Sequence, residues 1–98
     1  MAIKKQYLKN KSICKVTFSI EAKEANRVSV IGDFNGWDSN ATPLKKLKNG
    51  TFKGTADLEK DQSYEFRYAV DEDYVNDEEA DAFIWNDFAA GENGVLNL

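Results

Sequence analysis

Histidine is absent from the 98-residue sequence, and cysteine occurs only once, at Cys14. Without histidine, the chain has neither a histidine-based catalytic triad nor a histidine ligand for a metal. A single cysteine forms neither an intrachain disulfide nor a thiolate metal site. We therefore predict no metal site and no cofactor, and we expect Cys14 to be an ordinary packed thiol in a strand.

Long apolar runs are also missing, since no segment approaches the roughly 20 apolar residues that cross a bilayer. The positive charges of Lys4 and Lys5 are not followed by the apolar stretch of a secretory signal. We therefore expect no membrane partner and a cytoplasmic location. The length and the 42% hydrophobic content are typical of one folded domain spanning residues 1–98.

Positive charge is scarce, because 13 Lys and Arg residues face 17 Asp and Glu residues and leave a net charge of −4. Nucleic-acid binding needs a dense basic patch, and tracking a strand needs aromatic rings among the basic residues. The lysines instead form two groups without such rings, Lys4, Lys5, Lys9 and Lys11 near the start, and Lys45, Lys46 and Lys48 in a loop. We predict solvated lysines and no nucleic-acid partner.

Carboxylates are plentiful, but they crowd into one stretch that is typical of a solvated loop: Asp71, Glu72, Asp73, Asp77, Glu78, Glu79 and Asp81. A glycosidase needs two opposed carboxylates in a cleft, and a small sandwich offers little concave volume. We therefore expect no catalytic residues and no enzyme. An EF-hand starting at Asp77 fails because Ala82 stands where glycine is required, which leaves only an irregular calcium site as the alternative to a plain charged loop.

The hydrophobic periodicity is that of strands. Apolar and polar residues alternate in the runs 14–20, 28–30, 52–58 and 64–70, and the chain closes with the apolar residues Val95, Leu96 and Leu98. Turn signals separate these runs at 24–26, 35–36, 49–50, 60–62, 71–73 and 91–94, and the lysines of segment 4–8 suit an edge strand. The spacing predicts an all-β, immunoglobulin-like antiparallel sandwich of about seven strands.

The segment 28–37 is the most informative part of the chain. It begins as a strand, breaks at Gly32, turns through Asp33-Phe34-Asn35-Gly36 and ends on Trp37, which strand alternation does not readily bury. A flat aromatic ring beside amide and carboxylate groups suits a sugar, whose ring has an apolar face and a rim of hydroxyls. The alternative is that Trp37 packs on the edge of the sandwich and that Asn35-Gly36 merely turns the chain.

Further aromatic and amide residues fall at or beyond the predicted strand ends. They are Tyr74 and Trp85, with Asn35, Asn76, Asn86 and Asn93 in nearby turns. Amides both donate and accept hydrogen bonds, so each can pair with neighbouring sugar hydroxyls. Trp85 either covers the edge of the sandwich or extends the aromatic platform. Arg67, which points out of its strand, is either solvated or a donor to a ligand.

Five motifs follow one another along the chain, namely Gly32-Asp33-Phe34-Asn35-Gly36-Trp37, Pro43-Leu44, Phe66-Arg67-Tyr68-Ala69-Val70-Asp71, Tyr74-Val75-Asn76-Asp77 and Asn93-Gly94-Val95. In this order they resemble the early-set domain of isoamylases, the family-48 carbohydrate-binding module. That module also occurs in glycogen branching enzymes and in the beta subunit of AMP-activated protein kinase. The resemblance covers residues 13–98 and is to small stand-alone bacterial members.

The resemblance implies an immunoglobulin-like sandwich that binds alpha-1,4-linked glucans such as glycogen or starch. It implies sugar contacts by Trp37, Arg67, Tyr74 and Asn93, where Tyr74 replaces a second tryptophan. The chain departs from the family at Asp71-Glu72, Asn76-Asp77-Glu78 and Asn93-Gly94, where Asp-Gly, Asn-Asp-Pro and Asn-Ser are usual. We predict non-catalytic glucan binding; the alternative is a module that docks onto a protein partner such as a glucan-metabolising enzyme.

Overall fold

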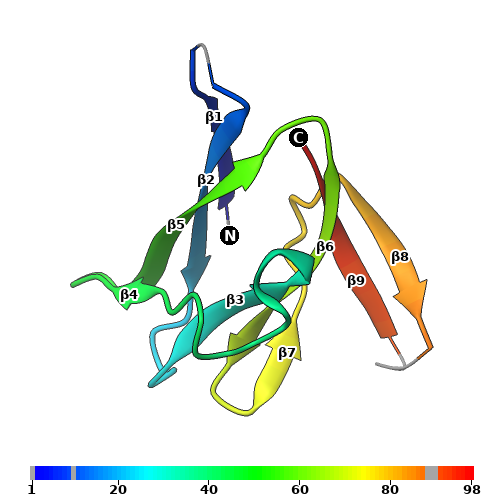
Figure 1. Cartoon of the computed structure of the whole chain (residues 1–98). Helices are drawn as coiled ribbons and strands as arrows, with labels where there is room; N and C mark the ends of the chain where they lie inside the picture. Colours follow the sequence, from blue (N-terminus) through cyan, green and yellow to red (C-terminus); the bar gives the residue numbers. More distant parts are fainter. Residues whose placement is uncertain (1, 10, 88–90) are drawn as a thin grey trace.

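The computed structural model describes residues 2–9, 11–87 and 91–98 (Figure 1). Within these residues the chain forms one short 3-10 helix, η1 (Asp33–Asn35), and otherwise β-strands. The nine strands of this described part are β1 (Ala2–Tyr7), β2 (Ile13–Glu21), β3 (Val28–Gly32), β4 (Lys45–Lys46), β5 (Thr51–Glu59), β6 (Ser63–Val70), β7 (Asp73–Val75), β8 (Ala82–Asn86) and β9 (Gly91–Asn97).

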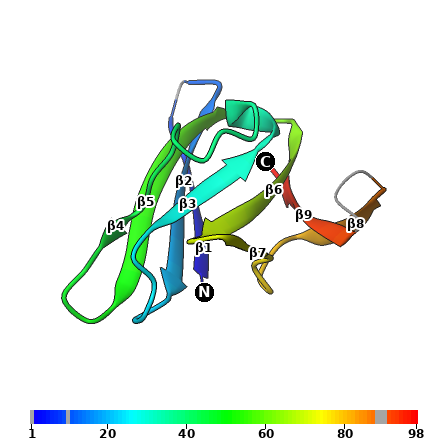
Figure 2. The ribbon, with the colours of Figure 1, turned by 90° about the horizontal axis from the view of Figure 1, so that it is seen from below.

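The strands form two antiparallel sheets that face each other (Figure 2). The first sheet has the order β1-β2-β5-β4, and the second has the order β3-β6-β9-β8. The strand β7 pairs with residues 68–70 of β6, next to β9, which pairs with residues 63–66. This arrangement confirms the predicted all-β, immunoglobulin-like sandwich. It has nine strands rather than about seven, partly because β4 and β7 are only two and three residues long.

The core lies between the sheets and follows the alternation of β2. Val16 and Phe18 on the inner face of β2 are fully buried, and so are Phe66 and Tyr68 on the inner face of β6. The Phe18 ring lies 5.7 Å from the Phe66 ring and 6.2 Å from the Tyr68 ring, in tilted and edge-on arrangements that aromatic pairs favour. Burial of these side chains supplies the main driving force for joining the two sheets.

The edge of β3 is covered by a loop, so this strand is buried on both faces. The Val30 N–H donates to the Thr42 carbonyl at 3.1 Å, and the Leu44 N–H donates to the Val28 carbonyl at 2.9 Å. The loop therefore satisfies backbone groups that a free edge strand would expose. This cover also fixes the position at which the chain leaves β3 toward η1.

The predicted turn at residues 91–94 is wrong, because these four residues begin strand β9. Gly94 is needed for space rather than for a turn, since a β-carbon there would lie 3.2 Å from the Phe66 ring. Asn93 consequently projects from the second sheet and not from a loop. Asn86 likewise ends strand β8 instead of lying in a turn.

An ion pair joins the two sheets at the side where β1 meets β9. The Lys5 ammonium donates to Asp81 at 2.6 Å and to the Asn97 carbonyl at 3.0 Å. The sheet order places β1 at an edge, as predicted for the segment near the start of the chain, and the ion pair gives one of its lysines a specific partner. In the described ranges, no helix is long and apolar enough to span a membrane.

Candidate functional site

The turn that follows β3 is held by the side chain of Asn35. The Gly32 N–H donates to Asn35 Oδ1 at 3.0 Å, while Asn35 Nδ2 donates to the Val30 carbonyl at 2.9 Å and to Thr42 Oγ1 at 3.0 Å. These three bonds occupy the amide oxygen and both amide N–H groups, so the role of this side chain is structural. Asn35, one of the amides that the sequence offered for pairing with sugar hydroxyls, therefore shapes the turn that carries the next aromatic ring.

Trp37 is the residue that this turn presents to solvent. Its backbone has φ 60°, which is a left-handed conformation that a bulky residue rarely adopts, and it follows Gly36, which is also left-handed. The side chain is 37% exposed, so the indole is not part of the core. Strained backbone of this kind is concentrated at ligand-binding positions, which makes Trp37 a functional candidate.

A carboxylate fixes the orientation of this indole. Trp37 Nε1 donates to Asp33 Oδ1 at 3.2 Å, and the other oxygen of Asp33 accepts the Glu65 backbone N–H at 2.9 Å. Asp33 thereby ties the ring to strand β6, beyond the point where β3 stops pairing with it. A ring held in this way is pre-oriented for a ligand and loses little freedom on binding.

A hydrogen-bonded network lies beside this anchor on the outer face of the second sheet. Arg67 Nε donates to Asn93 Oδ1 at 2.6 Å, and Asn93 Nδ2 donates to Glu65 Oε1 at 3.1 Å. Arg67 and Glu65 are half-buried, whereas Asn93 is only 2% exposed. Asn93 therefore positions the two charged groups, and its bond to Arg67 uses only one of the five guanidinium N–H groups.

Tyr74 stands on the same face. In the pairing of β6 with β7, Tyr74 lies directly opposite Ala69, which has the same orientation as Arg67 two residues earlier. Its side chain is 62% exposed. The structure thus places Arg67, Asn93 and Tyr74 on the outer face of the second sheet, and Asp33 links the partly exposed Trp37 ring to the end of β6 at Glu65.

The chain matches carbohydrate-binding module 48, the isoamylase N-terminal domain, over residues 6–84. It belongs to this family. Similar curated proteins are 1,4-alpha-glucan branching enzymes GlgB. The enzyme from Corynebacterium jeikeium is 59% identical over 32 residues, which are 33% of this chain and 4% of the enzyme. The enzyme from Ralstonia nicotianae is 41% identical over 46 residues (47% of this chain and 6% of the enzyme), and that from Oceanobacillus iheyensis is 38% identical over 58 residues (57% of this chain and 9% of the enzyme). The chain therefore spans less than a tenth of these relatives. The family confirms the predicted resemblance and supports carbohydrate binding.

Trp85 lies apart from the other predicted contacts of this family-48 module. It is opposite Glu92 in the pairing of β8 with β9, on the sheet face of Gly94 and the core residue Phe66. Its side chain is 62% exposed because it lies beyond the cover of the first sheet, and its Nε1 donates to Asp87 at 2.6 Å. Trp85 is thus on the opposite face of the sheet from Arg67 and Asn93.

The set of site residues predicted from the sequence did not include Asp33 and Glu65. Both carry signals in the sequence: Asp33 lies inside the motif that ends on Trp37, and Glu65 has the same strand parity as Arg67. What the sequence does not reveal is that the Asp33 carboxylate bonds both the Trp37 indole and the β6 backbone. That bond depends on where β3 ends relative to β6.

The acidic stretch of the module contains one buried carboxylate. Asp77 is 0% exposed, and it accepts the Tyr68 hydroxyl at 2.7 Å and the Glu79 N–H at 2.8 Å. Burial, together with this hydrogen bond and the negative charge of Asp77, raises the pKa of Tyr68 far above its ordinary value. Asp77 is therefore a structural anchor for the loop between β7 and β8. Among the described residues, no three acidic or cysteine side chains converge to hold a metal ion.

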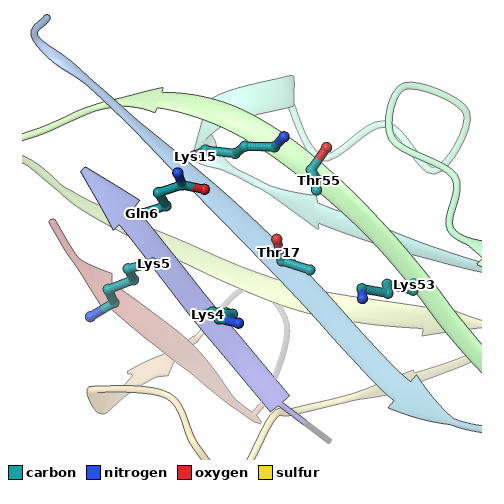
Figure 3. A pocket seen from close by; sticks show the side chains of 7 residues that line it. All are labelled: Lys4, Lys5, Gln6, Lys15, Thr17, Lys53 and Thr55. Atoms are coloured by element: carbon teal, nitrogen blue, oxygen red, sulfur yellow. The ribbon is translucent and has the colours of Figure 1, made fainter. Parts of the chain in front are cut away.

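A shallow hollow also lies on the first sheet of the module (Figure 3). Its walls come from β1, β2 and β5 and carry only lysine, threonine and glutamine side chains: Lys4, Lys5, Gln6, Lys15, Thr17, Lys53 and Thr55. No aromatic ring lines it, so it lacks the stacking surface that a sugar ring uses. We therefore place the candidate carbohydrate site on the second sheet.

Proposed function

We propose that this module binds alpha-1,4-linked glucans, without catalysis, on the outer face of its second sheet. The observation that carries the proposal is the Trp37 indole, which is 37% exposed on a left-handed backbone and is held by Asp33. The family supports carbohydrate as the ligand class. The matched relatives are 1,4-alpha-glucan branching enzymes, and this name suggests the type of glucan.

The two rings would supply most of the contact area. Trp37 and Tyr74 each present a flat face on which the C–H surface of a glucose unit can stack. Because the platform is open rather than enclosed, a bound sugar buries little area, and we expect dissociation constants from micromolar to millimolar. A helical glucan that touches both rings would bind better than a short one, because the second contact follows the first within one molecule.

Arg67 would supply the polar contact between the rings. Its Nε is already bonded to Asn93, which leaves four of the five guanidinium N–H groups for sugar hydroxyls. Glu65 receives the other amide group of Asn93, so the cation is held in place before the ligand arrives. We propose that Asn93 contributes mainly by positioning Arg67, because it is almost completely buried.

A titration with maltoheptaose tests the proposal. In an isotope-labelled sample, we expect concentration-dependent shifts of the Trp37 indole and of the Arg67 and Tyr74 amides. Trp37→Ala should weaken binding by about tenfold or more, because one stacking surface is lost. Tyr7→Ala is the matched control, since Tyr7 is a 53% exposed aromatic residue on the first sheet. The absence of any shift at about 10 mM sugar would contradict the proposal.

A further inference from the structure

In the described part of the chain the orders of the two sheets end in four strands, with β7 as a further short edge beside β6, and three of the four terminal strands are protected against pairing with another strand. Lysines lie on both faces of the edge strand β1 and make up the edge strand β4. The loop containing Thr42 and Leu44 bonds to the edge of β3. Lysines on edge strands and covering loops are the usual means by which proteins prevent strands from adding to a sheet.

The fourth edge, strand β8, has no such protection. Its sequence, Ala82-Phe83-Ile84-Trp85-Asn86, contains neither a charge nor a proline. Its three large side chains remain exposed, Phe83 at 45%, Ile84 at 48% and Trp85 at 62%. Phe83 and Trp85 lie on one face of the strand and Ile84 lies on the other, so exposed side chains occur on both faces, and no strand of the described part of the chain pairs with the outer side of β8.

We infer that β8 pairs antiparallel with β8 of a second copy of this chain, centred on Ile84. In this register Ile84 lies opposite Ile84 of the second copy, and each Phe83 lies opposite a Trp85. Two aromatic cross-strand pairs then form on one face and one aliphatic pair forms on the other, which are favourable combinations in antiparallel sheets. A twofold axis through the Ile84 pair makes the contact closed, so it yields dimers and not fibres.

The distribution of charge is compatible with this pairing. No charged residue lies within β8, and the acidic neighbours that would oppose each other are Asp81 and Asp87. Asp81 is already paired with Lys5 at 2.6 Å, which lowers the repulsion between these two groups. The net charge of −4 still makes two copies repel each other at long range. Salt screens that repulsion, so we expect the association to become stronger as ionic strength rises.

The available area sets the strength of this dimer. At roughly 150–250 Å² for a whole aromatic side chain, the exposed parts of Phe83, Ile84 and Trp85 amount to roughly 300 Å² per copy. Two copies would bury about 600 Å² from these side chains, below the roughly 1,200 Å² of most stable complexes. The dimer is therefore weak and reversible, with a dissociation constant on the order of 0.1–1 mM.

Sedimentation velocity across a concentration series tests the association. The full chain should shift from monomer toward dimer between about 0.02 and 1 mM, and the shift should grow with added salt. Ile84→Lys should lower the association constant by about tenfold or more, because two ammonium groups would meet at the twofold axis. Leu47→Lys is the matched control, since Leu47 is a 40% exposed apolar residue outside β8.

Cysteine substitution tests the register. Directly opposite residues in an antiparallel pair have Cα atoms about 4.5–5.5 Å apart, which suits a disulfide. Ile84→Cys should therefore cross-link in a glutathione buffer. Phe83→Cys and Trp85→Cys should not, because their copies would be diagonal neighbours about 7–8 Å apart. The buried Cys14 is common to all these variants.

Four outcomes would overturn the inference. They are a monomer at about 1 mM, an association that Ile84→Lys leaves unchanged, an association that salt weakens, and equal cross-linking from positions 83, 84 and 85. Circular dichroism of each variant checks that it remains folded, which the exposure of Ile84 leads us to expect. None of these measurements uses sugar, so failure of the dimer inference and failure of the proposed glucan binding can be distinguished.

Discussion

Three polar residues are fully buried in the described part of the chain, and all three belong to the second sheet or to the loop after β7, whereas the first sheet has none. They are Ser29, Asn93 and Asp77. The corresponding interior of the first sheet consists of apolar side chains, among them Val16, Phe18 and Ile20. Ser29 and Asn93 lie on the outer face of the second sheet, so this sheet buries polar groups outside the shared core, whereas the first sheet buries only apolar side chains.

The comparison links buried polar groups to the placement of the candidate site. Burying a polar group is costly unless it is hydrogen-bonded, and a fully bonded network fixes one arrangement. In the second sheet, the bonds of Asn93 hold Arg67 and Glu65, and the bond of Asp77 to Tyr68 holds the loop that leads to β8. The interior of the first sheet consists of apolar packing, and Lys4, Lys15 and Lys53 on its outer face are exposed to solvent.

The largest expected effect is on the buried hydroxyl. Tyr68→Phe removes the donor to Asp77 and should lower the free energy of unfolding by about 1–3 kcal/mol, because a buried carboxylate oxygen loses its partner. Tyr64→Phe in the same strand is the control, since its hydroxyl donates to the Glu59 carbonyl at an exposed position. Urea unfolding of both variants measures the difference. An equal decrease in the free energy of unfolding for the two variants would contradict the greater contribution that we assign to the buried hydroxyl.

The next effect concerns the network on the outer face. Asn93→Ala should lower stability by about 1–2 kcal/mol and should weaken glucan binding several-fold, since Arg67 and Glu65 lose the amide between them. Gln6→Ala removes an exposed amide from the first sheet and should stay within about 0.5 kcal/mol of the wild type. If Gln6→Ala were as costly as Asn93→Ala, the two outer faces would not differ as we describe.

A smaller effect is expected at the ion pair that joins the sheets. Desolvation alone would raise the pKa of Asp81, but hydrogen bonds from Lys5 and the Asn97 N–H, together with the positive charge of Lys5, outweigh it and lower that pKa. A lowered folded-state pKa stabilises the fold above the unfolded value of about 3.9, and this contribution is lost as the pH falls through the folded value.

Asp81→Asn should therefore be less stable than the wild type at pH 7 by up to about 1 kcal/mol, and the difference should vanish in strong acid. Urea unfolding at a series of pH values between neutral and strongly acidic measures this difference. A gap that persists unchanged in strong acid would mean that the contact between the sheets at Asp81 does not depend on charge.

The smallest effect lies on the first sheet. Lys45 and Lys53 are directly opposite each other on the outer face of β4 and β5. Like charges in this position are destabilising, so Lys53→Glu should raise stability by about 0.2–1 kcal/mol at low salt and by less at high salt. The same variant should leave glucan affinity unchanged, because this residue belongs to the other sheet.

The sequence predicted the strands that alternate and missed those that do not. In β2, buried Cys14, Val16, Phe18 and Ile20 alternate with more exposed residues, so the pattern and the structure agree. In β8, Phe83, Ile84 and Trp85 are consecutive and all exposed, which leaves no alternation to detect. The residues at 91–94 resemble a turn by composition, although Gly94 serves only to make room for a core ring.

For the candidate site, the sequence pointed to Trp37, Arg67, Tyr74 and Asn93 but not to Asp33 or Glu65, and it did not reveal how these side chains are connected. Trp37 and Tyr74 are both exposed, as a binding role requires, and Arg67 shares a face with Tyr74. The face on which Trp85 lies depends on the register of β8 against β9, which no local pattern encodes. The burial of Asn93 and the internal use of the Asn35 amide are likewise tertiary properties, because their partners come from other strands and loops.

The left-handed backbone of Trp37 has a consequence for anyone who engineers this domain. At φ 60°, glycine would have a lower backbone conformational energy than a residue with a large side chain. A search for thermostable variants would therefore tend to select glycine at position 37 and would discard the indole early. If Trp37 binds glucan as we propose, stability and binding place opposite demands on this position, so each stabilised variant must be tested for both.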